Sequence, residues 1–179
     1  MHKWTGNMKS INDIFRDIVD NTAKIYGSNV SYMFGDWEYI AGQLTEWSQS
    51  QETSKLKFPI ICLYSPYIED RTSKVPNASL EFIIMVDTRK EYLNEERERV
   101  SFVNVLRPVY DAFIKSILAS PDIVNEYNGV IPHLYTENYR YGRKGVEADG
   151  KPFRDFIDAI EIKNLNIKIK NIKCYGERI

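Results

Sequence analysis

The sequence contains few of the residues that build common catalytic and metal sites. Its 179 residues include two histidines, His2 and His133, and two cysteines, Cys62 and Cys174. His2 lies at the start of the chain, and the cysteine spacing matches neither a zinc motif nor a disulfide framework. The sequence also lacks a glycine-rich phosphate loop of standard spacing and a nucleophile elbow. We therefore expect a protein that is not an enzyme and needs no cofactor.

Long hydrophobic runs and an excess of one charge are missing as well. The longest apolar runs, such as residues 82–86, are too short to span a bilayer, and residues 1–6 lack the apolar centre of a signal peptide. Lysine and arginine total 24 against 25 acidic residues, a formal net charge of −1. This balance disfavours a free-standing nucleic-acid coat. We expect a soluble protein of a reducing cytoplasm without a membrane partner.

The composition is that of a folded chain. Hydrophobic residues make up 43% of it and aromatic residues 13%, too much for a disordered protein. A chain of this length can bury a core within one domain, so a single domain spanning 1–179 is expected. Polar and glycine-containing stretches predict long loops at about 37–56, 65–77 and 125–152.

The patterning predicts an α+β fold in which a small, mostly antiparallel sheet is packed by an N-terminal helix and a second, long helix. Ser10 can cap the first helix, expected over residues 11–26 from apolar spacings of three and four. Asn94 can cap the long helix, whose first turn is acidic. Pro108 lies in its middle and predicts a kink near Asn104 or a break into two helices.

Alternating or continuous apolar residues predict strands at 30–34, 60–64, 80–86 and 160–169. The strand at 80–86 has apolar residues on both faces. It is therefore expected at the centre of the sheet, covered by a helix on one side and by a partner on the other. The apolar positions of the last strand change phase, which predicts a bulge near residues 163–164 or the meeting of two strands there.

One enzyme alternative is left open by the acidic residues. Asp122, with Glu161 and Lys163 downstream, is similar to the Asp…Glu-x-Lys arrangement of metal-dependent restriction-type nucleases, in which two carboxylates hold the metal and lysine steadies the attacking water. An alternating strand also produces Glu-x-Lys by chance, so we favour a role without catalysis. Asp155, Asp158 and Glu161 are interpreted as solvated charges on a strand.

The 12 tyrosines are the main compositional anomaly, and several lie in predicted loops. Tyrosine and arginine are enriched at protein interfaces, which favours a role in assembly. Lysines of the last strand, including Lys168 and Lys170, are interpreted as protection of an exposed sheet edge, with phosphate contact as the alternative. His133 is interpreted as a hydrogen-bonding residue of a loop.

The order of predicted elements resembles that of the tail-completion, or tail-terminator, proteins of long-tailed bacteriophages. The likeness covers residues 57–64, 78–88, 91–118 and 156–169: an apolar strand introduced by Pro59, a polar loop, a strong strand, a long helix with an acidic start and a final strand. The resemblance implies a small sheet packed by helices and assembly into a ring, commonly a hexamer. Such a ring caps the tail tube at its head-proximal end and joins the tail to the head connector.

The resemblance also implies partners and a location. The partners are further copies of the chain, the tail tube protein and a connector or stopper protein of the neck, with DNA only as cargo that passes through the lumen. The protein then belongs to the tail or neck of the virion and is assembled in the host cytoplasm. Another neck protein, for head completion or as a stopper, is the neighbouring alternative.

Ring assembly requires two different patches on each subunit. We assign them to the loop at 65–77, the segment 135–143 and the terminal strand, whose basic and aromatic side chains can make such contacts. The candidate interface residues are Arg71, Lys74, Tyr139, Arg140, Tyr141, Arg143, Lys168 and Lys170.

Overall fold

The structure is a computed structural model that describes residues 9–49, 57–73, 75–125, 128–141 and 156–170. Its elements are α1 (Ile11–Tyr26), β1 (Ser31–Gly35), α2 (Trp37–Trp47), β2 (Ile60–Tyr64), β3 (Ile68–Asp70), β4 (Asn77–Asp87), α4 (Asn94–Arg97), the π-helical segment η1 (Glu98–Leu106), α5 (Arg107–Ala119), β5 (Ile123–Val124), β6 (Leu134–Tyr141) and β7 (Ile157–Ile169). In this part of the chain, no helix has both the length and the hydropathy needed to cross a membrane.

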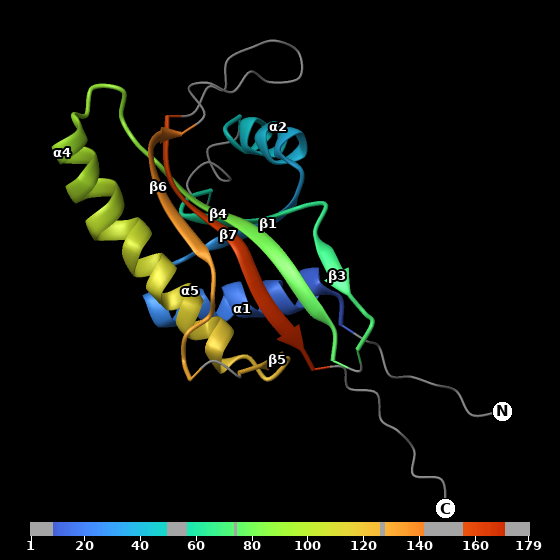
Figure 1. Ribbon diagram of the computed structural model, residues 1–179. Helices are drawn as coiled ribbons and strands as arrows, with labels where there is room; N and C mark the ends of the chain where they lie inside the picture. The colour runs from blue at the N-terminus through green and yellow to red at the C-terminus, as the bar shows by residue number, and fades with distance from the viewer. Residues whose placement is uncertain (1–8, 50–56, 74, 126–127, 142–155, 171–179) are drawn as a thin grey trace, which may run out of the picture.

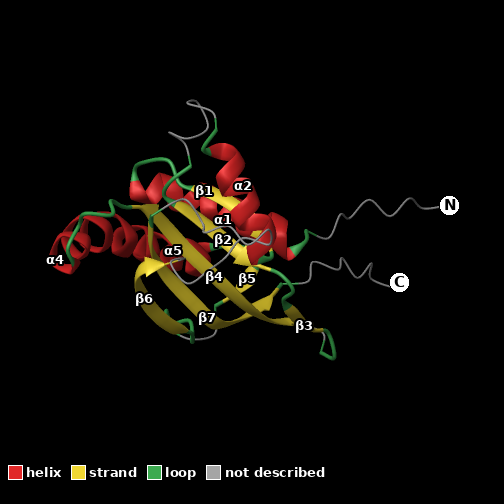
Figure 2. Ribbon diagram, turned by 90° about the horizontal axis from the view of Figure 1, so that it is seen from above, coloured by secondary structure: helices red, strands yellow, loops and turns green. Residues whose placement is uncertain are grey.

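The seven strands form one mixed sheet in the order β1-β2-β4-β7-β5, with β3 beside β4 and β6 beside β7. The pair β1 and β2 is parallel, and the other pairs are antiparallel. The predicted α+β fold with a mostly antiparallel sheet is therefore confirmed, and β4 lies at the centre between β2 and β7 as its pattern indicated. The sheet is curled, and β3 and β6 lie at opposite ends of it (Figure 2).

Local sequence signals fix both ends of α1. The Ser10 hydroxyl accepts from the backbone N–H of Asp13, and the Asp13 carboxylate accepts from that of Ser10, a reciprocal capping box. Gly27 ends the helix with φ 82°, a left-handed conformation that glycine adopts without strain, and its N–H donates to Ala23. The prediction for this helix is confirmed at both boundaries.

The larger core lies where α1, η1 and α5 cover one face of the sheet. Its centre is aromatic: the rings of Phe15 and Phe82 are 4.7 Å apart, and those of Phe82 and Phe113 are 5.2 Å apart. All three side chains are completely buried. Buried aromatic groups of this kind contribute more to stability than any surface contact, so this layer holds the sheet and the long helix together.

The other face of the sheet carries a second, smaller core under α2. Ile40 and Leu44 of α2 are fully buried and belong to the same cluster as Cys62, Ile83 and Met85 of the sheet. The apolar second face of β4 is thus covered by a helix of the same chain at these positions. The expectation that a partner covers it is wrong there.

The prediction of a loop at 37–56 is wrong for its first half, which is α2. Asp36 caps this helix, because its carboxylate accepts from the backbone N–H of Tyr39 at 2.8 Å. Trp37, Ile40 and Leu44 lie at helical spacings, but the helix is short and its apolar stripe is interrupted by polar residues. Packing on the sheet, rather than a strong sequence period, stabilises it. Residues 50–56 lie outside the described residues.

Pro108 distorts the long helix without breaking it. The helix continues from Asn94 to Ala119, with the nine-residue π-helical segment η1 immediately before the proline, and Figure 1 shows one continuous coil. The N–H of Arg107 donates to the carbonyl of Phe102, five residues earlier. Since proline has no N–H and its ring crowds the preceding turn, the wider π turns accommodate it. The predicted irregularity is present as π-helix, and the predicted break is wrong.

Two of the expected loops contain strands. The short β3 lies within 65–77, and β6 occupies eight residues within 125–152. A strand of mostly polar residues has no hydrophobic alternation to mark it, and pairing with a neighbour decides its conformation. The remaining residues 142–155 lie outside the described residues.

The phase change in β7 is a bulge, as predicted. Asn164 has φ 54°, and the pairing with β4 shifts register between Leu80 and Phe82, whose partners are Leu165 and Ile162. The extra residue keeps aliphatic side chains on the same face on both sides of the bulge. The interpretation of β7 as an exposed edge is wrong, because β4 pairs with it on one side and β6 and β5 on the other.

Candidate interaction surfaces

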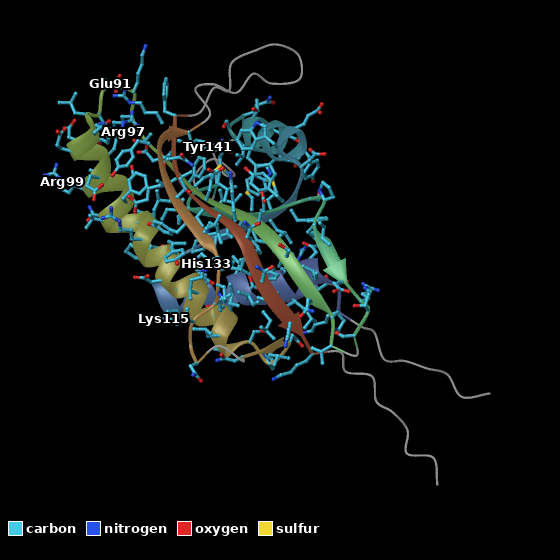
Figure 3. The ribbon with its side chains drawn as sticks, viewed as in Figure 1. Glu91, Arg97, Arg99, Lys115, His133 and Tyr141 are labelled. Atoms are coloured by element: carbon cyan, nitrogen blue, oxygen red, sulfur yellow. The ribbon has the colours of Figure 1, made fainter. Side chains whose placement is uncertain are left out.

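A fully buried ion pair joins the start of the long helix to β7. Arg97 Nη1 lies 2.9 Å from Asp158 Oδ1, and neither side chain has any exposed surface. Figure 3 labels Arg97 near the start of the long helix. The other carboxylate oxygen accepts from the Ser101 hydroxyl at 2.7 Å. The interpretation of Asp158 as a solvated charge is wrong, because its side chain lies on the face that η1 covers. Only the tertiary structure brings Arg97, sixty-one residues away, to it.

The remaining donors of the Arg97 guanidinium bind the turn that follows β4. Its Nε donates to the carbonyl of Tyr92 at 3.0 Å, and its Nη2 donates to that of Arg89 at 2.6 Å. Thr88 accepts a further bond at 3.3 Å. A buried charge is tolerated only when it is paired and hydrogen-bonded in this way. The network therefore fixes the turn and the start of the long helix to the sheet.

The same carboxylate shapes the end of β6. The backbone N–H of Arg140 donates to Asp158 Oδ1 at 2.9 Å, and Arg140 has φ 62°, in the left-handed region. The register of β6 on β7 shifts between Asn138 and Tyr141. This bulge places the Arg140 side chain at the surface. Among the predicted interface residues, Arg140 is thus presented outward by a conformation that a buried group holds.

The two tyrosines beside Arg140 belong to the two cores of the subunit. The Tyr139 ring lies 4.3 Å from that of Phe102 and its hydroxyl binds Glu98. The Tyr141 ring makes an edge contact with Trp37, and its hydroxyl is 3.1 Å from that of Tyr64. Burial raises the pKa of Tyr141. Since both side chains are half-buried within the subunit, Arg140 carries most of the surface chemistry of this segment.

A polar cluster ties the outward side of β6 to the long helix. Arg107 Nε and Nη2 donate to the two oxygens of Glu137 at 2.8 and 3.0 Å, and Arg107 also pairs with Glu98 at 2.6 Å. The Tyr135 hydroxyl donates to Glu137 at 2.5 Å. The hydrogen bonds from Arg107 hold the pKa of Glu137 below its ordinary value. This forked arrangement aligns β6 with the helix.

The other predicted interface residues do not join Arg140 in one patch. Arg71 is exposed and pairs with Glu69 near β3, at the Asn77 end of β4, whereas Asp158 pairs with Val86 near the other end. That separation is about 30 Å along the strand. Lys168 is half-buried in β7, and Lys170 is exposed just beyond it. Lys74 and Arg143 lie outside the described residues.

The structure does not bring Asp122 to the other two residues of the nuclease alternative, Glu161 and Lys163, which form an ion pair at 3.9 Å. Asp122 lies beside Ile123, which pairs with Ile169, and Glu161 is eight residues earlier on β7, about 25 Å away. Asp122 pairs with Lys9 at 3.2 Å, and Glu161 accepts from Asn138 at 2.6 Å. Among the described residues, no group of three or more metal-ligating side chains could hold an ion.

His133 is engaged in local hydrogen bonds, as interpreted from the sequence. Its Nδ1 is 2.7 Å from the carbonyl of Ile131, and its Nε2 is 2.7 Å from the Tyr110 hydroxyl. The carbonyl can only accept, so Nδ1 carries the proton and Nε2 accepts from Tyr110. The ring therefore anchors the segment before β6 to α5.

A groove that the sequence did not reveal runs along the outer edge of β1. It encloses about 230 Å³ between α1 and α2. Its lining includes Asn12 and Arg16 of α1, Phe34 of β1, and Tyr39, Gln43 and Trp47 of α2. A Cβ added at Gly35 would lie 2.6 Å from the Tyr39 ring, so this glycine lets the ring approach the strand. The aromatic residues of 37–47 were the available signal, but only the helix places them beside β1.

No family model matches the chain, and no curated protein matches it in sequence.

Proposed function

We propose that the protein is a structural component of a phage virion, a tail terminator that forms a ring at the head-proximal end of the tail tube. In this role it ends tail polymerisation and joins the tail to the connector or stopper of the neck, with DNA only passing through the lumen. The assignment follows the resemblance in element order. A hexamer is the expected ring.

The observation that carries the proposal is the difference between the two ends of the curled sheet. At the β3 end, Ile68 is 74% exposed beside the charged Arg71. At the β6 end, Leu134 is 58% exposed on the strand that presents Arg140. A head-to-tail ring needs two unlike patches on opposite sides of each subunit, and these ends supply them. The exposed Ile68 near Arg71 is typical of an interface, and at the β6 end the exposed Leu134 and Arg140 lie at opposite ends of the same strand.

The first test is the mass of the purified chain by light scattering over a range of protein and salt concentrations. A ring of six subunits of 20.9 kDa has a mass of about 125 kDa. This mass, or a monomer that becomes a ring only with tail tubes, supports the proposal. A monomer or dimer that never associates and leaves tail length uncontrolled contradicts it.

Charge reversal tests the patch at β6. Replacing Arg140 and Arg143 together by glutamate should abolish the ring and tail joining. In the proposed ring the arginines meet acidic groups of the neighbouring subunit, and glutamates at these positions would be repelled by them. Lys115→Glu is the matched control, since Lys115 is an exposed base on α5, far from Tyr141 at the end of β6 (Figure 3). Unchanged assembly of the double variant would remove this patch from the interface.

A further inference from the structure

The outer edge of β1 has unpaired backbone groups among the described residues. Ser31 N–H donates to the carbonyl of Pro59 and the Gly35 carbonyl accepts from Ser65 N–H, at 2.9 and 3.0 Å. In a parallel pair, alternate residues direct both backbone groups to the same neighbour. Tyr32 and Phe34 therefore direct their N–H and C=O groups away from β2. Within the described chain, no strand pairs with that side of β1.

The groove beside this edge has room for an incoming strand. Its volume of about 230 Å³ corresponds to a few side chains, and α1 and α2 form walls above and below the plane of the sheet. Phe34 is 38% exposed and Tyr39 is 53% exposed, although both are large and apolar. An extended chain laid against β1 would satisfy the backbone groups and cover these rings.

The charge of the groove favours an incoming strand that carries an acidic side chain. Arg16 lies in its lining, is exposed, and makes no hydrogen bond or ion pair with another described residue in the contacts of this structure. The other residues that line the groove are uncharged, and the nearby Asp13 carboxylate, which is bound to Ser10, acts on Arg16 through its charge alone. A carboxylate is the side chain that complements an unpaired guanidinium in such a setting.

We propose that the edge of β1 binds an extended segment of another protein by strand addition, with an acidic side chain of that segment opposite Arg16. Main-chain hydrogen bonds to Tyr32 and Phe34 supply the pairing, and the contact with Arg16 supplies the selectivity. The inference does not rest on the proposed function, although the Phe34 ring lies 6.4 Å from that of Tyr67 in the loop at 65–77 assigned to the ring.

A second copy of the chain is a poorer occupant on charge grounds. The acidic residues of its described edge strands are already bound within the subunit: Glu69 to Arg71 at 2.7 Å, Asp70 to Thr72 at 2.9 Å and Glu137 to Arg107. The strand that pairs with β1 needs an acidic side chain that is free to bind Arg16. The edge strands of a second copy do not have one among the described residues.

The probe is an acetylated and amidated hexapeptide of alternating threonine and valine with one central glutamate, carrying a fluorescent label. Binding to the full chain is followed by fluorescence anisotropy. Two control peptides isolate the two interactions. One replaces the glutamate by lysine, and the other carries N-methyl groups at alternate residues, which removes the backbone donors on one edge.

Variants of the protein test the same two interactions. Phe34→Pro removes an outward N–H, which an edge strand tolerates, and should weaken binding about tenfold or more. Phe34→Ala keeps the N–H and should weaken binding less. Arg16→Glu should abolish the preference for the acidic peptide, whereas Lys24→Glu, the same charge change farther along α1, should leave binding unchanged. Circular dichroism melting confirms that each variant is folded.

The outcomes decide the proposal. Saturable binding that loses its preference for the acidic peptide with Arg16→Glu and weakens with N-methylation and with Phe34→Pro supports it. It is overturned by equal binding of the lysine peptide, by unaltered binding to the Arg16 and Phe34 variants, or by no saturation up to about 1 mM peptide. If Phe34→Pro instead dissociates an oligomer of the chain, a second copy occupies the edge of β1, and the assignment to another protein is wrong. Ring mass, measured on the same variants, tests the proposed function separately.

Discussion

The outer strands β1 and β6 lie at opposite edges of the same sheet, and they differ in the contacts that they make with the rest of the chain. The side chains of Tyr139 and Glu137 in β6 are bound to the long helix, and the backbone N–H of Arg140 donates to Asp158 of β7. Beside β1, by contrast, a groove separates α1 from α2, and the backbone of Tyr32 and Phe34 faces it.

The difference shows how a chain can fix one edge of a sheet and leave another available. Unpaired edges invite association with other chains, and proteins usually cover or charge them. Here polar groups of β6, such as Glu137 and the Tyr139 hydroxyl, are hydrogen-bonded to the long helix inside the subunit. The β1 side keeps its polar backbone groups and one arginine for an external partner. The two edges thus differ in how their side chains and backbone groups are bound inside the subunit.

The largest expected effect comes from breaking the buried pair behind β6. Asp158→Asn leaves the Arg97 guanidinium buried without its counter-ion and should lower the free energy of unfolding by about 3–5 kcal/mol. Urea denaturation measures this loss. Asp17→Asn is the control, because Asp17 is 58% exposed and pairs with Lys9, so its loss should cost under about 1 kcal/mol. Equal effects of the two substitutions would contradict the role assigned to the buried pair.

A smaller effect is expected from the Arg107 cluster, and it depends on pH. Arg107 holds the folded-state pKa of Glu137 below its ordinary value of 4.5. The resulting stability is present above about pH 4.5 and is lost as the pH falls through the lowered pKa. Arg107→Gln should therefore cost at most about 1 kcal/mol near pH 7, and its unfolding free energy should fall less steeply than that of the wild type between pH 5 and about pH 3. Parallel pH curves of the two proteins would show that the pair does not contribute.

At the β1 edge, Gly35→Ala should weaken both stability and recognition. Gly35 has φ 158°, a backbone conformation that favours glycine, and the added Cβ meets the exposed Tyr39 ring at 2.6 Å. The strained backbone should lower the free energy of unfolding by about 1 kcal/mol. Binding of the acidic hexapeptide should weaken because the groove wall has moved. A loss of stability without a change in binding would place Gly35 in the core rather than in the site.

The smallest effect on stability is expected at Arg71. Its side chain is 63% exposed, and the pair with Glu69 lies in solvent. Arg71→Ala should change the free energy of unfolding by less than about 0.5 kcal/mol. The mass distribution of the protein in solution should respond instead, because Arg71 belongs to the patch assigned to the ring. An unaltered mass distribution would remove Arg71 from that patch.

Much of the fold could be predicted because its signals are local. The capping box of Ser10 and Asp13 and the glycine after α1 fix that helix within a few residues of sequence. The apolar alternation of β4 is strong enough to place it at the centre of the sheet. The phase change near Asn164 predicted a bulge, because a strand cannot move its aliphatic residues to the other face without an extra residue.

The sequence-based predictions failed where contacts between distant residues decide the structure. α2 has a weak amphipathic pattern and is stabilised by Ile40 and Leu44 against the sheet. Asp158 looks like an ordinary strand charge until Arg97 is placed beside it. The contacts of Tyr139 and Tyr141 with the two cores are likewise tertiary, and the assignment of these residues to an interface stays a prediction. None of these neighbours is visible in a single sequence.

The sequence by itself determined the α+β class, the central strand, the boundaries of α1 and the irregular helix before Pro108, because hydrophobic periodicity, capping and the missing proline N–H act over a few residues. The tertiary structure alone decided which charges are buried and which edge of the sheet stays open. Those properties depend on residues far apart in the chain, such as Arg97 with Asp158 and Arg16 with the edge of β1. Their physical cause is desolvation by packing, which has no counterpart in the linear order of residues.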